Sequence, residues 1–87
     1  MRIEWTPMAV ASARRYLHDQ VGMRAIGTAI AMLADVPYPS PPEGFHRGRY
    51  HRLRAGSYRI MYVVDDSVIT VERVDWLARV YSGRPDE

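Results

Sequence analysis

A run of arginines and tyrosines in the second half of the chain has the residue types and spacing that point most directly to chemistry. No acidic residue lies between Glu43 and Asp65, a segment with five arginines and two histidines. These arginines are Arg47, Arg49, Arg52, Arg54 and Arg59. A guanidinium binds two phosphate oxygens at once and stays charged when it loses water. The segment therefore predicts an anion-binding surface.

Alternation along the predicted strands gathers several of these side chains on one face. Successive residues of a strand point to opposite sides of the sheet. In residues 48–55 one side carries Tyr50, Arg52 and Arg54, and the other carries His51 and Leu53. Pairing across the Gly56-Ser57 turn brings Arg59 beside the arginines. Because a tyrosine ring can stack on a base, we expect this face to suit single-stranded RNA.

Motifs for other kinds of site are missing from the sequence. There is no Walker-type or dinucleotide-binding glycine loop. There is no cysteine, and His18, His46 and His51 lack the spacing of metal ligands. The serines have no nucleophile-elbow context. We therefore expect no cofactor and no metal ion.

The composition indicates one small folded domain over residues 1–87. No segment has the roughly 20 apolar residues of a membrane span, and the N-terminus has no apolar core of a secretory signal. The lack of cysteine suits a reducing compartment. We therefore expect a cytoplasmic protein with no membrane partner. All twelve basic residues are arginine, and the net charge is only +2. The acid-free segment 44–64 holds five of these arginines and is therefore strongly positive in a nearly neutral chain.

The first half of the chain predicts a strand followed by a helical hairpin. Residues 1–5 form the strand, and Thr6-Pro7 provides a helix N-cap and a proline at the first helical position. The first helix is expected to run to about Gln20 and to be broken by Gly22; its inward residues are Val10, Ala13 and Leu17. The second helix is expected over 23–36, with the apolar stripe Ile26, Ala29, Ile30 and Leu33. Residues 37–42 contain four prolines and predict a stiff crossover loop.

The second half predicts strands over residues 48–55, 57–64 and 67–74, joined by tight turns. Such short connections indicate antiparallel hairpins. Tyr58 and Tyr62 alternate with apolar residues and are expected in the core, and Ile69 and Val71 are expected to point inward. Helices before strands indicate an α+β fold. We expect an N-terminal strand and a helical hairpin packed on a twisted, mainly antiparallel sheet of three to four strands, with the arginine-bearing face open.

Residues 50–81, YHRLRAGSYRIMYVVDDSVITVERVDWLARVY, resemble the second half of toxins of the RelE/ParE superfamily. Those toxins have a basic strand ending in Leu-Arg, then Gly-x-Tyr-Arg, two apolar residues and Tyr, an acidic turn, a further strand and a closing Val-Tyr. The matching pieces here are Leu53-Arg54, residues 56–62, Asp65-Asp66 and Val80-Tyr81. The order of elements in the first half also agrees, so the resemblance covers nearly the whole chain.

The resemblance implies a RelE-like mRNA interferase, the toxin of a type II toxin–antitoxin module. RelE-type members cleave mRNA in the ribosomal A site by attack of a 2′-hydroxyl on the adjacent phosphate, which leaves a 2′,3′-cyclic phosphate. By position, Arg52 and Arg59 match catalytic basic residues, and Tyr81 matches a tyrosine that orients the nucleotide. The other candidates for RNA or phosphate binding are Tyr50, Arg54, Arg49, Arg47, Arg73 and Arg79. The implied partners are the ribosome, mRNA and a cognate antitoxin with an acidic, amphipathic helical segment.

The chain departs from the pattern of the family in two places. Many members have His-Arg near the end, where this chain has Trp76-Leu77, and Tyr50 takes the place of a basic residue on the second strand. An arginine cannot act as general base, because its pKa stays above about 12. The acceptor of the 2′-hydroxyl proton is therefore open. Tyr81 and Tyr50 would be weak bases, and His51 alternates to the other face.

Two other functions fit the same residues. Loss of the His-Arg pair favours a ParE-like toxin that inhibits DNA gyrase and is not an enzyme. A catalytically silent protein that only binds its antitoxin is the third hypothesis. Inhibition of gyrase would indicate the former, and harmless overexpression without antitoxin would indicate the latter.

Overall fold

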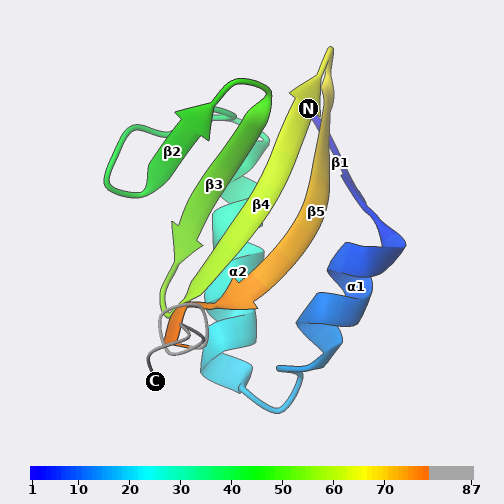
Figure 1. Cartoon of the computed structure of the whole chain (residues 1–87), viewed down its shortest axis with the longest axis vertical. Coiled ribbons are helices and arrows are strands. Elements are labelled where there is room, and N and C mark those ends of the chain that lie inside the picture. The colour runs from blue at the N-terminus through cyan, green and yellow to red at the C-terminus, as the bar shows by residue number, and fades with distance from the viewer. Residues whose placement is uncertain (79–87) are drawn as a thin grey trace, which may run out of the picture.

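The structure, a computed structural model, describes residues 1–78. Figure 1 shows the helices and strands, whose bounds are β1 Arg2–Trp5, α1 Pro7–Arg14, α2 Gln20–Leu33, β2 Gly44–Arg47, β3 Tyr50–Ala55, β4 Tyr58–Asp65 and β5 Val68–Trp76. The strands form one sheet in the order β1-β5-β4-β3-β2. β1 pairs in parallel with β5, and the other neighbours pair antiparallel.

The predicted α+β class is confirmed, but the sheet has five strands rather than three to four. The strand that the sequence did not predict is β2, four residues that follow the proline-rich loop. So short a segment shows no alternation of its own. It becomes a strand because β3 offers a free edge, with which it pairs from Gly44 opposite Leu53 to Arg47 opposite Tyr50.

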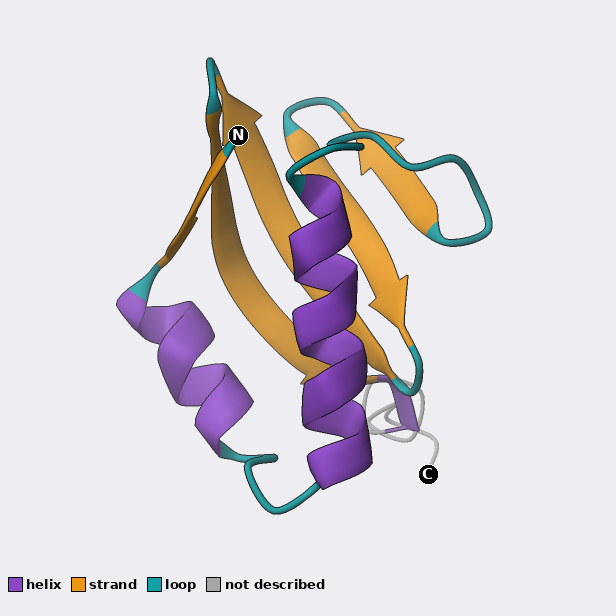
Figure 2. Cartoon of the chain, turned by 180° about the vertical axis from the view of Figure 1, so that it is seen from behind, coloured by secondary structure: helices purple, strands orange, loops and turns teal. Residues whose placement is uncertain are grey.

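Both helices cover the same face of the sheet (Figure 2). α1 contacts β5, whereas α2 contacts β3 and β4. The two helices diverge in Figure 2, so the predicted hairpin is a pair of helices that pack separately on the sheet. Within residues 1–78 neither helix is long and apolar enough to cross a membrane. Within residues 1–78 no helix or strand covers the opposite face of the sheet, which we call the open face.

The first helix begins as predicted but ends at Arg14 instead of about Gln20. Thr6 caps its start, where the Ala9 N–H donates to the Thr6 hydroxyl at 3.0 Å. The helix ends early because Asp19 serves as the N-cap of α2, and the chain must therefore turn before it.

The inward faces of the helices follow from these bounds. The residues that pack on the core from the first helix and its following turn are Ala9, Ala13 and Tyr16. The predicted inward residues Val10 and Leu17 are instead 36% and 62% exposed. Leu17 lies beyond the end of α1, so helical spacing no longer places it on the same face as Val10. On α2 the predicted stripe is confirmed: Ile26, Ile30 and Leu33 are buried and Ala29 packs beside them.

A contact among Asp19, Gly22 and Tyr58 fixes the start of α2 on the sheet. The Asp19 carboxylate accepts hydrogen bonds from the Gly22 N–H at 2.9 Å and from the Tyr58 hydroxyl at 2.6 Å. The first of these bonds caps α2, and the Tyr58 hydroxyl, followed by the Gly22 N–H, lowers the pKa of Asp19. The prediction that Gly22 breaks a helix is wrong, since it lies inside α2. A Cβ there would collide with the Tyr58 ring and the Asp19 carboxylate, so the close approach of helix and strand requires glycine.

The core lies between the helices and β3 to β5. Tyr58 and Tyr62 are 2% and 0% exposed, which confirms their predicted place. Ile69 and Val71 point inward as predicted and are fully buried. The Tyr62 hydroxyl donates to the Pro37 carbonyl at 2.8 Å, so the core also holds the start of the proline-rich loop.

A one-residue bulge in β5 decides which side chains face away from the helices. The register between β4 and β5 shifts at Glu72, which has no partner on β4. Because side chains alternate with a period of two, an extra residue reverses the facing of all that follow. Simple alternation from Val71 would turn Arg73 toward the helices. With the bulge, Val74 is buried in the core, and Arg73 and Asp75 lie on the open face.

Titration of tyrosine absorbance tests the two buried phenols. Burial is the main cause that raises the pKa of Tyr58 and of Tyr62 to about 12. The chain has six tyrosines and no lysine, so tyrosines dominate its alkaline titration. We expect Tyr58 and Tyr62 to ionise only near pH 12 in the folded protein.

The free energy of unfolding at alkaline pH depends on the same two phenols, Tyr58 and Tyr62. Both pKa values are raised on folding, so their contribution is complete below pH 10 and is lost as the pH rises toward 12. In the Tyr58→Phe variant only one phenol should still ionise late, and in the urea-unfolded chain no phenol should. Ionisation of every tyrosine together in the folded protein would contradict the burial.

Candidate nucleic-acid interface

The open face of the sheet carries most of the arginines singled out in the sequence. Residues on neighbouring strands stand opposite one another in rows across this face. One row is Phe45, Arg52, Met61 and Arg73; the next is Arg54, Arg59 and Asp75; and one at the other end is Arg47, Tyr50, Val63 and Thr70. The candidate residues are therefore divided between the two ends of the sheet.

Three of the candidates line one pocket, which we call the arginine pocket. Its volume is about 290 Å³, and its lining includes Arg52, Arg54 and Arg59 together with Glu43, Phe45 and Leu77. Two arginines come from β3 and one from β4, and the tight turn at Gly56 brings the strands together. The convergence is the one that alternation and hairpin pairing predicted.

Arg54 and Arg59 stand directly opposite each other on β3 and β4. Like charges at opposed positions repel and destabilise the pairing. Neither Arg52 nor Arg54 forms an ion pair with an acid of residues 1–78. The buried Nε of Arg59 also has no hydrogen-bond partner in that part of the chain, at a cost of about 1–3 kcal/mol. A bound anion would relieve part of this repulsion.

Arg59 already forms an ion pair with an acid on β5, which the sequence did not predict. Its Nη2 donates to Asp75 Oδ2 at 3.2 Å, and Arg73 Nε donates to Asp75 Oδ1 at 2.8 Å. The side chains of Arg59 and Asp75 are 23% and 12% exposed. The carboxylate therefore offsets part of the positive charge and fixes the positions of two arginines. We call this group the Asp75 triad.

Sequence reasoning missed Asp75 because the last strand was expected to end at residue 74. The strand reaches Trp76, and the bulge at Glu72 turns Asp75 toward Arg59. The same bulge brings Arg73 to the open face. An acid two residues after an arginine at the end of a predicted strand was the available signal, but alternation alone would have placed both on the helix side.

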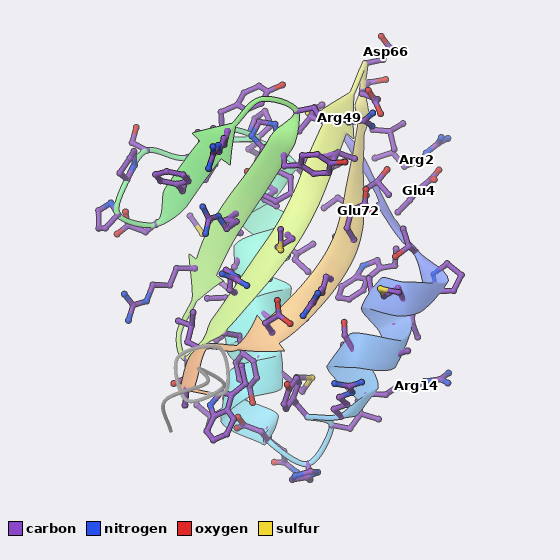
Figure 3. All side chains as sticks on the ribbon, viewed as in Figure 1. Arg2, Glu4, Arg14, Arg49, Asp66 and Glu72 are labelled. Carbon is purple, nitrogen blue, oxygen red and sulfur yellow. The ribbon has the colours of Figure 1, made fainter. Side chains whose placement is uncertain are left out.

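Arg47, Arg49 and Tyr50 lie at the other end of the sheet. Along β3, Tyr50 is about 13 Å from Arg54. Arg49 forms an exposed ion pair with Asp65 at 3.5 Å, and its guanidinium lies 5.8 Å from the centre of the Tyr50 ring. Figure 3 shows Arg49 near the turn that joins β4 and β5. These residues do not join the arginine pocket but extend the positive surface away from it.

His51 faces the helices, as alternation predicted, and does not reach the arginine face. It is 7% exposed, and its Nδ1 lies 2.7 Å from Nδ1 of His46. Nε2 of His46 bonds to the Pro39 carbonyl at 2.9 Å. A carbonyl only accepts, so in a neutral His46 the proton is on Nε2, and His51 donates from Nδ1. Burial and then His46 lower the pKa of His51. The pair holds β2 and the proline-rich loop beside β3.

Phe45 was not singled out in the sequence, because the strand that carries it was not predicted. Its ring is 51% exposed on the open face and lies 4.8 Å from Cζ of Arg52. Arg79 and Tyr81 lie outside residues 1–78. Within those residues, no three His, Cys, Asp or Glu side chains are grouped so that they could hold a metal ion.

The sequence matches no protein-family model and no curated protein. Solved structures do match. YafQ from E. coli strain BL21(DE3) has a TM-score of 0.72 at 15% identity, over 93% of this chain and 99% of that chain. The RelB-RelE antitoxin-toxin complex from Methanococcus jannaschii gives 0.66 at 18%, over 94% and 99%. The YoeB-YefM complex from Staphylococcus aureus gives 0.69 at 16%, over 87% and 95%.

These values show that the chain has the fold of the YafQ, RelE and YoeB toxins, which confirms the fold implied by the sequence resemblance. Identities of 15% to 18% concern the fold alone. One fold supports many functions, so function must be argued from the arginine pocket and its surroundings.

Substitution of Asp75 tests the triad. Asp75→Asn removes the charge that two guanidiniums share, and it should lower the free energy of unfolding by about 1–3 kcal/mol. The matched control is Asp65→Asn, the same change in the exposed pair with Arg49, which should cost less than about 1 kcal/mol. Urea unfolding measures both. Equal, small effects of the two substitutions would show that the Asp75 pairs do not hold the arginines.

Proposed function

We propose that this protein is the toxin of a type II toxin–antitoxin module and a metal-independent, ribosome-dependent mRNA endoribonuclease. The observation that carries the proposal is the convergence of Arg52, Arg54 and Arg59 on one pocket of the uncovered sheet face. The fold of toxins whose solved structures include antitoxin complexes supports it. Action on the ribosome makes the protein cytoplasmic.

The reaction is attack of an mRNA 2′-hydroxyl on the adjacent phosphate. A new bond forms from the 2′-oxygen to phosphorus, and the bond to the 5′-oxygen of the next nucleotide breaks. The leaving 5′-oxygen takes up a proton from solvent, so the products are a 2′,3′-cyclic phosphate and a 5′-hydroxyl. Negative charge accumulates on the non-bridging oxygens in the transition state, and guanidiniums fixed around them stabilise it. Arg52, Arg54 and Arg59 supply those guanidiniums, and the Asp75 triad holds Arg59 in place.

Glu43 is our candidate for the acceptor of the 2′-hydroxyl proton. The arginines cannot accept a proton, and His51 lies on the face that the helices cover. The carboxylate of Asp75 already accepts from two guanidiniums. Glu43 lines the arginine pocket and forms no ion pair with a base of residues 1–78. Tyr81 keeps the role of orienting the nucleotide that the resemblance gives it.

Primer extension on an mRNA in a reconstituted translation reaction tests this function. Wild-type protein should cleave the message in the A site. Arg52→Ala and Arg54→Ala should each slow cleavage by about 100-fold or more, because each removes a guanidinium from the transition state. Glu43→Gln should slow cleavage by about 100-fold or more and leave mRNA binding unchanged, because it removes only the proton acceptor.

Arg24→Ala is the matched control, since Arg24 is an exposed arginine on α2 behind the sheet. It should cleave like the wild type. Arg59→Ala is a poorer probe, because it also breaks the pair with Asp75 and must be read against its unfolding curve. Absence of cleavage by the wild type would sink the nuclease proposal. Full activity of Glu43→Gln would exclude Glu43 as the proton acceptor and would leave the nuclease proposal standing.

Gyrase inhibition is the second candidate function. Leu77 lines the arginine pocket, so one of the two residues standing in place of the His-Arg pair puts an apolar side chain where the family pattern has charge. Asp75 reduces the positive charge further. A protein that failed to cleave mRNA but blocked gyrase supercoiling at stoichiometric amounts would be a ParE-like toxin. Failure in both assays with harmless overexpression would leave a silent antitoxin-binding protein.

A cognate antitoxin is the partner proposed in each case. The uncovered arginine face calls for an acidic segment that neutralises it. The outer face of α2 exposes Val21 and Met32, which an amphipathic helix of the same antitoxin would cover. A short neighbouring reading frame for an acidic-tailed, DNA-binding protein would support this pairing.

A further inference from the structure

Phe45 is the only phenylalanine in the chain and is half exposed. It lies on β2, the edge strand of the sheet (Figure 1), directly opposite Arg52 on β3. Successive side chains of a strand point to opposite sides, and the neighbouring His46 contacts His51 on the helix side. The Phe45 ring therefore stands on the open face, where the core does not cover it.

The ring lies against a guanidinium. Cζ of Arg52 is 4.8 Å from the centre of the Phe45 ring, a cation–π distance. An exposed contact of this kind contributes only about 0.5–1 kcal/mol, which does not account for a large apolar ring on an open edge strand. Aromatic rings and guanidinium planes are the surfaces on which single-stranded bases stack.

Phe45 and the arginines share a pocket. All four line the arginine pocket. Phe45 stands opposite Arg52 in one row across the sheet, and Arg54 stands opposite Arg59 in the next. Arg52 and Arg54 are two residues apart on β3 and point to the same side, which separates them by about 7 Å. One nucleotide spans such a distance between its base and its phosphate. The pocket thus offers an aromatic surface next to a pair of phosphate ligands.

The backbone around Phe45 is held before any ligand arrives. The Gly44 N–H donates to the Ser40 carbonyl at 3.1 Å, and the Arg54 N–H donates to the Glu43 carbonyl at 2.7 Å. His46 bonds to both Pro39 and His51 on the other side of the strand. A ring fixed in this way loses little freedom when a base stacks on it.

We infer that Phe45 and Arg52 form a stacking platform for one base of a single-stranded RNA whose adjoining phosphate is bound by Arg54 and Arg59. The inference rests on the proposed function and adds a base subsite to it. An acidic peptide would use the arginines but would have no need of the aromatic ring. The pairing of the ring with a row of guanidiniums therefore favours a nucleotide over a peptide.

Binding to two matched probes tests the platform. The first probe is a hexanucleotide with 2′-O-methyl riboses, which cannot be cleaved, and the second is an abasic chain with the same number of phosphates. Phe45→Leu should weaken binding of the hexanucleotide by about 5- to 150-fold, because the stacking of one base is lost. The same substitution should leave binding of the abasic chain unchanged. Phe45→Trp should retain hexanucleotide binding. Arg54→Ala should weaken the binding of both probes, and Arg24→Ala should change the binding of neither.

A fluorine label observes the ring directly. Because the chain has one phenylalanine, 4-fluorophenylalanine places a single fluorine in the protein, on Phe45. Its resonance should shift with saturation when the hexanucleotide is added and should move far less with the abasic chain. The free energy of unfolding of Phe45→Leu should lie within about 1 kcal/mol of the wild type, since the ring lies outside the core and loses only the contact with Arg52.

The outcomes separate this inference from the proposed function. Equal hexanucleotide binding by Phe45→Leu and wild type, with mRNA cleavage intact, would overturn the platform alone. Failure of the wild type both to bind the hexanucleotide and to cleave mRNA would overturn the proposed function and the platform with it. A fluorine shift with hexaglutamate but none with the hexanucleotide would assign the ring to an acidic peptide and also overturn the platform.

Discussion

Repulsion among arginines is the constraint that the open face of this sheet must satisfy. Arg54 and Arg59 are forced into direct opposition by the β3–β4 register, and Arg52 stands on the same face two residues away. Asp75 makes the arrangement possible, because it neutralises Arg59 from the neighbouring strand and binds Arg73 as well. It leaves Arg52 and Arg54 without an acid partner in residues 1–78. The protein thus keeps enough positive charge to attract an anion while it limits the repulsion.

Packing on the other face of the sheet stabilises the fold and offsets the repulsion among the arginines. Tyr58 and Tyr62 alternate with Arg59 and Met61 along β4, so the strand that carries Arg59 is also anchored in the core. The Tyr58 hydroxyl ties β4 to the N-cap of α2, and the Tyr62 hydroxyl ties it to the start of the proline-rich loop. A guanidinium on a rigid strand is positioned without help from its ligand, which is what electrostatic stabilisation of a transition state requires.

The proline-rich loop and the histidine pair extend the site beyond the predicted strands. They hold β2 at the edge of β3 and thereby bring Glu43 and Phe45 to the arginine pocket. A carboxylate and an aromatic ring are the two groups that the arginines cannot replace: one accepts a proton and the other stacks on a base. Tyr50 and Trp76-Leu77 stand where the toxins that the sequence resembles have basic residues. The open face gains Arg73 only through the bulge.

Local information determined the parts that the sequence predicted by itself. Period-two alternation placed Tyr50, Arg52 and Arg54 on one face, His51, Tyr58 and Tyr62 on the other, and Thr6 and the tight turns set where elements begin. The rest depends on contacts between distant residues. β2 forms because it pairs with the edge of β3, and α1 ends early because Asp19 caps α2. Gly22 does not break a helix but allows α2 to approach Tyr58 closely. The bulge at Glu72 brings Asp75 and Arg73 to the arginines. Alternation cannot foresee an inserted residue, because only the pairing of two strands in space defines which residue is extra.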